Sequence, residues 1–583
     1  MRISKLGGTI RIVFDFAVEQ NSILLSLQVR RGKNYYDLYL QNSKVPDSFV
    51  VDDVWYNLYV NYQDVQVALD YAGISKLGSI SLGQYIKIRQ FADDNPNIEV
   101  IDNAAQALSE HPVKEIDFAP PAKLTATLYP YQKTGYQWMR FVIDSQCGCI
   151  LGDEMGLGKT VQIIALITEQ KQEGKGPALV IAPVSLLENW KRELEKFTNG
   201  IKVLVHHGSG RTGLYTDFDG YDVVIISYNT ASSDQSLLKM VDWNLIIVDE
   251  AQNIKNPNAI RTKSIKRIPC HTAIAVTGTP FENHMTDLWS LLDFIAPGCF
   301  GKLSQFENEF TDDVDGARRF EPYLTPLMLR RRVSEVAQDL PERVDVPQAL
   351  EMSTKEIIAY EQQREAILSS FNGSNATLPM LQKLRMYCTH PSLVDGIEYS
   401  DPSVCSGKYE RLLELLDEIN SLGEKTILFT SYNKMFEILQ TDIHKRFRIP
   451  VMAINGSTPT AERQPIIDAF SNIVGPALLV LNPRAAGAGL NISAASRVIH
   501  YNLEWNPSLE DQASARAYRR GQDKTVFVYR LFYKDTVEEI INERIEKKRS
   551  MFDAAIIGTD GTTDNSEDII RALMISPGGK QYD

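Results

Sequence analysis

Short runs of apolar residues alternate with helix-patterned stretches over residues 125–300. Six such runs fall in this part of the chain, namely CGCILG, PALVIAP, KVLVHH, DVVIIS, LIIVDE and TAIAVTGT. Apolar runs rich in β-branched residues predict buried strands, and their alternation with helices is typical of a parallel sheet in an α/β fold. We therefore expect a first α/β lobe over residues 116–300. Ligands bind at the carboxyl ends of parallel strands, so its chemistry should lie there.

The same alternation returns further along the chain and predicts a second parallel α/β lobe over residues 416–550. Its apolar runs are KTILFTSY, VMAING, ALLVLN, RVIHYN and VFVYRLFY. The charge-laced segment DTVEEIINERIEKKRSMFDAAI predicts an amphipathic helix that braces this lobe. Two such lobes in one chain indicate a cleft between them.

The remaining parts of the chain carry other patterns, and residues 1–115 show no catalytic motif. Residues 1–115 are rich in strand patterns and predict a small accessory β or α+β domain. Residues 301–415 predict a helical linker or insertion, in which a capping box from Ser353 to Glu356 opens a long helix. Residues 551–583 are rich in Gly, Asp and Ser, and we expect a mobile tail there.

Composition narrows the class of protein. The 583 residues are 44% hydrophobic and 23% charged, as in an ordinary globular protein. The longest apolar runs are far shorter than a membrane span, so we expect no membrane contact. None of the six cysteines forms a CxxC pair, so we expect no structural zinc and a reducing compartment. A net charge of −13 argues against a broad basic surface for nucleic acid but leaves room for a local basic strip.

The sequence LGDEMGLGKT follows an apolar run and precedes the helix-patterned VQIIALITEQ. Gly156 and Gly158 allow a tight turn that points backbone N–H groups at phosphates. Lys159 supplies charge to the β- and γ-phosphates, and Thr160 supplies a hydroxyl to Mg²⁺. The generic GxxxxGK[ST] pattern has Gly where this chain has Asp153. The strand–loop–helix context nevertheless favours nucleotide binding over a chance glycine-rich turn.

The run LIIVDEAQ places two carboxylates at the end of a buried strand. Asp249 can hold Mg²⁺ through its water shell, and Glu250 can orient and deprotonate an attacking water. A solvated acid pair is the alternative, which the nearby phosphate loop disfavours. In the second lobe, QASARAYRRGQ predicts a helix on which Arg516 and Arg519 share a face and could act as arginine fingers.

Together these motifs resemble the superfamily-two helicase-like ATPases, and within them the Swi/Snf-type double-stranded DNA translocases. The resembling stretches are LYPYQKTGYQW, GDEMGLGKT, IAPVSLLENW, VDEAQNIKNP, TGTPFENHMTDLWSLLDFIAPGCFG, LRRR and LNPRAAGAGLNISAASRVIHYNLEWNPSLEDQASARAYRRGQ. They stand in family order over about residues 125–550 and leave residues 1–115 uncovered. Asp153 is the residue that this family usually has at its position. The resemblance implies two RecA-like lobes forming an ATP cleft, with ATP and Mg²⁺ as cofactors, in a bacterial, phage or archaeal form.

The resemblance also assigns roles at matching positions. Gln132 would recognise adenine, Asp249 and Glu250 would serve Mg²⁺ and water, and Arg516 and Arg519 would contact the γ-phosphate. The phosphates would be cradled by Gly152, Asp153, Glu154, Met155, Gly156, Leu157, Gly158, Lys159 and Thr160. Coupling of the ATP state to lobe movement would fall to Gln252, Thr277, Gly278 and Thr279. Many relatives have His at position 252, but Gln can still form hydrogen bonds, so we expect hydrolysis to be retained.

By the same resemblance, DNA contacts would lie on the cleft face away from ATP. They would come from Ser185, Trp190, Lys191, Ser227, Tyr228, Arg484 and Trp505. Contacts to the phosphate backbone give affinity without sequence readout, and a narrow strip of them is compatible with the net charge. Trp505 could wedge into a minor groove or pack in a core beside Pro507, whereas packing is the favoured interpretation for Trp190. Arg331 and its two arginine neighbours could face DNA or brace a lobe.

The leading hypothesis is a DNA-stimulated ATPase that moves along double-stranded DNA and displaces or remodels what is bound there. One alternative is a helicase that separates DNA or RNA strands, and another is a nucleotide-gated DNA-binding scaffold without turnover. We expect a cytoplasmic protein, nucleoid-associated when bound to DNA, with a protein partner at the N-terminal domain.

Overall fold

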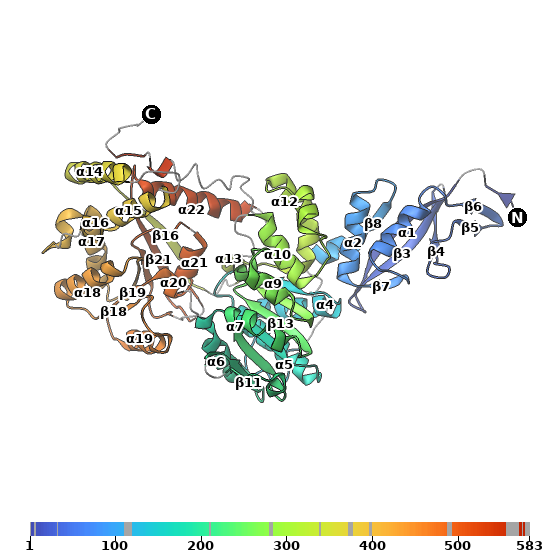
Figure 1. Ribbon diagram of the computed structural model, residues 1–583, viewed down its shortest axis with the longest axis horizontal. Helices are drawn as coiled ribbons and strands as arrows, with labels where there is room; N and C mark the ends of the chain where they lie inside the picture. The colour runs from blue at the N-terminus through green and yellow to red at the C-terminus, as the bar shows by residue number, and fades with distance from the viewer. Residues whose placement is uncertain are drawn as a thin grey trace. The chain divides into compact units, whose positions relative to one another are not determined.

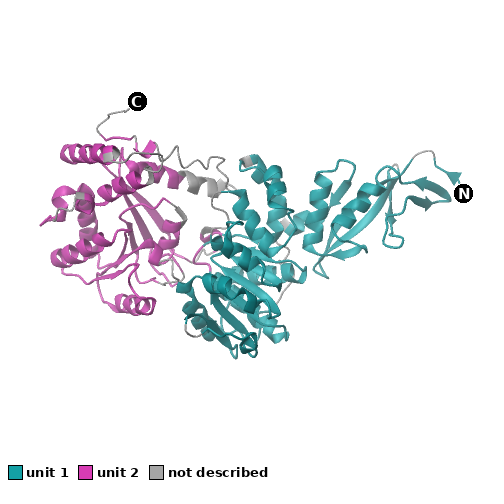
Figure 2. Cartoon of the chain, in the orientation of Figure 1, with its two compact units in different colours: residues 1–154, 158–331 teal, residues 155–157, 332–583 magenta. Residues whose placement is uncertain are grey.

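The computed structural model describes most of the chain as two compact units. The described residues are 2–4, 7–31, 33–109, 119–208, 211–278, 284–336, 340–370, 377–395, 399–486, 492–505, 507–519, 521–554, 571–573 and 575–577. Residues 1–154 and 158–331 make up the first unit, and residues 155–157 and 332–583 make up the second (Figure 2). Most of the predicted mobile tail and the candidate residue Thr279 lie outside the described residues.

Seven parallel strands form the sheet of the first lobe (Figure 1). Their order across the sheet is β11 (Val203–His206), β12 (Val223–Ser227), β10 (Ala178–Ala182), β13 (Trp243–Asp249), β14 (Cys270–Val276), β9 (Cys149–Leu151) and β15 (Met328–Leu329). Every residue of β10 and β12 is buried, which requires the continuous apolar sequence of these strands. All six apolar runs of this region are therefore strands, as predicted.

Helices accompany this sheet through the rest of the lobe. They are α4 (Pro130–Asp144), α5 (Lys159–Gln172), α6 (Leu187–Phe197), α7 (Tyr228–Ser233), α8 (Gln235–Leu238), α9 (Ile260–Lys266), α10 (Met285–Ile295), α11 (Leu303–Glu309) and α12 (Val314–Leu324). Helix α5 begins directly after the predicted phosphate loop, so the strand–loop–helix order is confirmed.

Six parallel strands form the sheet of the second unit. Their order is β16 (Arg343–Leu350), β21 (Val526–Tyr533), β20 (Arg497–His500), β17 (Thr426–Phe429), β19 (Leu478–Leu481) and β18 (Val451–Ile454). Its helices are α13 (Val333–Val336), α14 (Thr354–Ser370), α15 (Thr377–Thr389), α16 (Ser392–Asp395), α17 (Gly407–Ser421), α18 (Asn433–Phe447), α19 (Thr460–Asn472), α20 (Pro483–Ala486), α21 (Pro507–Ser514) and α22 (Val537–Ala554). The second predicted α/β lobe is therefore present, with α22 as its predicted last helix.

The segment expected to be a helical linker also supplies one strand to each sheet. Strand β15 pairs with β9 in the first lobe, and β16 pairs with β21 in the second. Strand β16 lies at a sheet edge and contains Pro347, a residue that cannot donate to a ladder and is tolerated at edges. The capping box that opens α14 is present, since Ser353 N donates to Glu356 Oε2 at 2.8 Å.

The N-terminal domain combines strands and helices, which agrees with the α+β form of the prediction. Its larger sheet contains β4 (Asn34–Leu38), β3 (Ser22–Arg31), β2 (Thr9–Ala17), β8 (Glu99–Asp102) and β7 (Gly78–Ile80). Its smaller sheet contains β1 (Arg2–Ile3), β6 (Val54–Asn57) and β5 (Ser48–Val51). Its helices are α1 (Tyr62–Tyr71), α2 (Leu82–Asp93) and α3 (Ala104–Ser109). The domain contacts the first lobe through Phe16 and Phe141, whose rings lie 5.7 Å apart, and through the Tyr323 hydroxyl, which donates to Asp93.

Candidate nucleotide site and nucleic-acid contacts

The phosphate loop connects β9 to α5 and has a backbone that favours glycine at two positions. Gly156 has φ 93° and Gly158 has φ 73°, both in the left-handed region that side chains rarely adopt. A Cβ at Gly158 would also come within 2.5 Å of the Gln132 Nε2 atom. The glycines predicted from the motif are therefore required by the conformation of the loop.

Two predicted nucleotide-binding side chains meet at this loop. Lys159 Nζ donates to the carbonyl oxygen of Asp153 at 2.7 Å, which holds the ammonium group over the loop. Gln132 is buried, and its Oε1 atom accepts from Tyr129 N at 3.0 Å at the start of α4. Its position beside Gly158 places an amide at the edge of the loop, where the predicted contact with a base stays a prediction.

The paired acids lie at the carboxyl end of β13, as expected. Trp190 Nε1 donates to Asp249 Oδ2 at 2.8 Å, and the backbone N of Glu250 donates to Asp249 Oδ1 at 2.9 Å. Burial, and then the neighbouring Glu250 charge, raises the pKa of Asp249. Glu250 has φ 53°, a left-handed conformation that costs a non-glycine residue about 1–2 kcal/mol. Strain of this kind at a candidate catalytic carboxylate is typical of functional sites.

A hydrogen-bonded chain of side chains connects Glu250 to the end of the next strand. Gln252 Nε2 donates to Glu250 Oε2 at 2.7 Å, and Thr277 Oγ1 donates to Gln252 Oε1 at 2.8 Å. Thr277 is buried directly after β14, and Gly278 follows it. An amide carries both a donor and an acceptor, so Gln252 can join the carboxylate and the hydroxyl at the same time. The structure thus joins Glu250, a predicted catalytic residue, to Gln252 and Thr277, two of the four residues predicted to couple hydrolysis to lobe movement.

Three predicted DNA contacts of the first lobe are instead buried inside it. Trp190, Ser227 and Tyr228 are 1%, 1% and 4% exposed. The Tyr228 hydroxyl lies 2.5 Å from the carbonyl oxygen of Asp249 and 3.0 Å from that of Glu250. Burial and then the nearby Asp249 charge raise the pKa of Tyr228 well above its ordinary value, so it stays a donor.

Trp190 and Tyr228 therefore support the two acids, a role that the sequence interpretation missed. Ser227 accepts from Thr230 N at 3.2 Å and so caps α7. The other two predicted contacts, Ser185 and Lys191, are partly exposed.

Three candidate residues of the second lobe, Arg484, Arg516 and Arg519, lie in α20 and after α21. Arg484 is exposed in α20. The expectation that Arg516 and Arg519 share a helix face is wrong, because α21 ends at Ser514 and both arginines lie in the turns that follow. The Arg516 carbonyl oxygen accepts from Ile492 N at 3.0 Å, which takes it out of a helical ladder. Their predicted contact with a γ-phosphate does not depend on a helix and stays a prediction.

Trp505 packs at the edge of a buried cluster built from α14, α15 and α22. The guanidinium carbon of Arg544 lies 5.2 Å from the centre of its ring, within cation–π range. These contacts favour the packing interpretation over the minor-groove wedge.

We therefore expect Trp505→Ala to lower the free energy of unfolding by roughly 2 kcal/mol, less than the loss for a fully buried Trp. Basal and DNA-stimulated ATP turnover should fall by the same factor as folded protein is lost. Thermal unfolding and turnover with and without DNA measure both effects. An unchanged melting temperature with a lost DNA response would return Trp505 to the DNA site.

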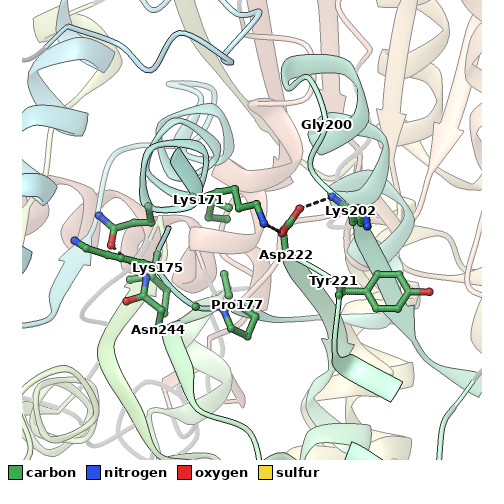
Figure 3. A pocket seen from close by; sticks show the side chains of 14 residues that line it. Lys171, Lys175, Pro177, Gly200, Lys202, Tyr221, Asp222 and Asn244 are labelled. Carbon is green, nitrogen blue, oxygen red and sulfur yellow. Dashed lines mark hydrogen bonds and ion pairs between the residues drawn. The ribbon is translucent and has the colours of Figure 1, made fainter. Parts of the chain in front are cut away.

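A separate pocket of about 360 Å³ lies at the other end of the first sheet (Figure 3). Lys171 forms an ion pair there with Asp222, whose Oδ2 atom also accepts from Lys202 N at 2.9 Å. The pocket is lined by the amino ends of β10 and β13, opposite to the end that carries the loop and the paired acids.

Residues 131–393 match the family described as SNF2-related domain, and residues 407–521 match the helicase conserved C-terminal domain. Together these matches cover most of both α/β lobes. The chain belongs to the SNF2-related family. The two matched domains are those of ATP-dependent, helicase-like enzymes.

Several curated proteins are similar to this chain over most of its length. The putative ATP-dependent helicase/translocase YwqA of Bacillus subtilis is 35% identical over 81% of this chain and 52% of its own length. The Zorya protein ZorD of Escherichia coli is 33% identical over 73% of this chain and 44% of its own. The chain therefore spans about half the length of these curated relatives.

A solved structure, the Sulfolobus solfataricus SWI2/SNF2 ATPase core in complex with dsDNA, is 33% identical. The match covers 79% of this chain and all of that one, with a TM-score of 0.40. Among the described residues, no helix is both long and apolar enough to cross a membrane.

Proposed function

We propose that this protein hydrolyses ATP and uses the energy to move along double-stranded DNA, displacing or remodelling what is bound there. The observation that carries the proposal is the chain from Glu250 through Gln252 to Thr277, in the same lobe as the phosphate loop. It links the carboxylate suited to activate water with the strand end that leads to the family's coupling motif. A change at the reacting phosphate can therefore be passed to the backbone beyond β14.

The residues at the loop fit Mg²⁺-ATP by their chemistry. Thr160 and Asp249 supply the oxygen ligands that Mg²⁺ prefers, and Lys159 supplies positive charge for the phosphates. When bound, Mg²⁺ would neutralise phosphate charge. Glu250 would orient a water molecule and accept its proton. Gln252 would hold the Glu250 carboxylate in place by donating a hydrogen bond to its Oε2 atom. Arg516 and Arg519 would stabilise the charge that develops on the transferred phosphoryl group.

The proposal that the protein moves along DNA is supported by the family and by partly exposed polar residues. The relatives are named as helicases or translocases, which act on nucleic acid. Ser185, Lys191 and Arg484 are at least partly exposed and can contact backbone phosphates, which carry no sequence information. The WNP and RAYRRGQ segments resemble the Swi/Snf-type block rather than that of strand-separating helicases. A scaffold without turnover has no need for Lys159 and Glu250 together.

The deciding experiment compares ATP turnover without nucleic acid, with single-stranded DNA, with duplex DNA and with RNA. We expect duplex DNA of any sequence to stimulate turnover most. With Lys191 and Arg484 as two phosphate contacts, the apparent DNA affinity should fall about tenfold between about 50 and 200 mM salt, because counterions are released.

Equal stimulation by single strands, together with strand displacement, would support the helicase alternative instead. Nucleotide-dependent DNA binding without turnover would support the scaffold.

A further inference from the structure

Asp153 is a carboxylate at the first of the two glycine positions of the generic phosphate-binding pattern. Its side chain is fully buried. A buried carboxylate is strongly unfavourable unless it is paired and hydrogen-bonded. The chain therefore has to supply a partner for Asp153 inside the nucleotide-binding lobe.

That partner is Arg331, whose own side chain is only 11% exposed. Arg331 Nε donates to Asp153 Oδ1 at 2.9 Å, and its Nη2 atom donates to Asp153 Oδ2. This bidentate pairing is the strongest geometry available to an arginine and a carboxylate. The third nitrogen of Arg331, Nη1, donates to the carbonyl oxygen of Tyr131, at the start of α4.

Gln162 completes the cluster from the other side of the loop. Its Nε2 atom donates to Asp153 Oδ2 at 3.1 Å, and its Oε1 atom accepts from Arg331 Nη2 at 2.9 Å. Gln162 lies one turn into α5, three residues after Lys159. A Cβ at Gly135 would collide with Gln162 Oε1 and lie 2.6 Å from Arg331 Nη2. Helix α4 therefore carries glycine where this cluster needs space.

The cluster joins both ends of the loop to the last strand of the first unit. Asp153 precedes the loop glycines, Gln162 follows them, and Arg331 bonds to both. The backbone is joined as well, because Gly152 N donates to Leu329 O at 2.7 Å and Glu154 N donates to Arg331 O at 2.9 Å. Arg331 is also the last residue of the first unit, and the chain enters the second unit at the next residue.

We propose that Arg331 is a positioning residue that fixes the phosphate loop in its nucleotide-binding shape through Asp153 and Gln162. Because it lies at the exit of the first unit, it also makes the shape of the loop sensitive to the chain segment that leads to the second. The inference rests on the proposed ATPase function for its meaning. Of the two interpretations of the LRRR segment, it selects bracing over DNA contact for Arg331.

The test measures the dissociation constant of a fluorescent ADP analogue together with the melting temperature, for Arg331→Lys, Arg331→Gln and Asp153→Asn. Arg331→Lys keeps the positive charge but loses the bidentate hydrogen bonding to Asp153. We therefore expect this variant to fold and to bind nucleotide about tenfold more weakly. KM for ATP should rise more than kcat falls. In the double variant Asp153→Asn/Arg331→Gln, the losses should not multiply, since both changes break one interaction.

Arg140→Gln is the matched control. Arg140 is also nearly buried, and it joins the same two helices by pairing with Glu169 and Glu173, away from the loop. It should lower the melting temperature and leave the dissociation constant for nucleotide unchanged.

Wild-type affinity in both Arg331 variants would overturn the inference, and so would an equal loss of affinity in Arg140→Gln. ATP turnover by the wild-type protein is measured separately and decides the proposed function. The nucleotide affinity of the variants decides the role of Arg331.

Discussion

Glu250→Gln is expected to reduce ATP turnover about 10²–10⁴-fold while Mg²⁺-ATP still binds, because a general base is lost and the geometry is kept. An amide cannot accept the proton of the attacking water. Its carbonyl oxygen can still accept from Gln252 Nε2, which lies 2.7 Å from the present carboxylate. The backbone amide of residue 250 still donates to Asp249. The chain from residue 250 through Gln252 to Thr277 should therefore survive the substitution.

Single-turnover hydrolysis and equilibrium binding of ATP measure the two effects separately. Glu188→Gln is the matched control, since Glu188 is an exposed carboxylate in α6 of the same lobe. It should leave both quantities unchanged. Near-normal turnover in Glu250→Gln would remove Glu250 from catalysis, and a loss of nucleotide binding would give it a structural role instead.

Lys408→Met is expected to lower the free energy of unfolding of the second unit by about 3–5 kcal/mol, because it leaves a buried carboxylate without its cation. Lys408 and Glu538 are 0% and 3% exposed, and Lys408 Nζ lies 2.5 Å from both carboxylate oxygens. The ammonium group also lies 5.3 Å from the centre of the Tyr533 ring. The pair connects the first turn of α17 to the first turn of α22.

Chemical denaturation of the full chain measures this loss of free energy from the unfolding transition of the second unit. Lys534→Met provides the control, since Lys534 pairs with Glu351 at 3.1 Å and their side chains are 44% and 80% exposed. That loss should be no more than about 1 kcal/mol. If the two variants lost similar stability, the buried pair would contribute no more than a surface one.

The sequence patterns predicted those strands whose apolar runs are continuous. Strand β10 is buried at every position and β13 is buried over residues 245–248, so these positions had to be apolar and the pattern was clear. The two strands of the presumed linker were missed for opposite reasons. Strand β15 has only two residues, and β16 is a polar edge strand whose partly buried and exposed positions alternate.

The candidate site could be predicted only where one short segment carries the chemistry. The phosphate loop and the paired acids are each contiguous, and their strand-end positions were correctly inferred. Trp190 and Tyr228 support the acids through contacts 59 and 21 residues distant in sequence, which no local pattern reveals. The helix predicted at Arg516 does not form. The carbonyl oxygen of Arg516 accepts a hydrogen bond from the backbone N of Ile492, a residue distant in sequence, instead of taking part in a helical ladder.

The two residues of β15 also shield the strand that feeds the phosphate loop. Strand β9 has only three residues, and without β15 it would be the edge of the first sheet. An open edge offers unpaired N–H and C=O groups to any other chain, and such edges promote aggregation. Because β15 pairs with Ile150 and Leu151, those groups are not available to another chain. The segment that leaves the first lobe thus also protects the lobe from self-association at the strand that leads into the predicted phosphate loop.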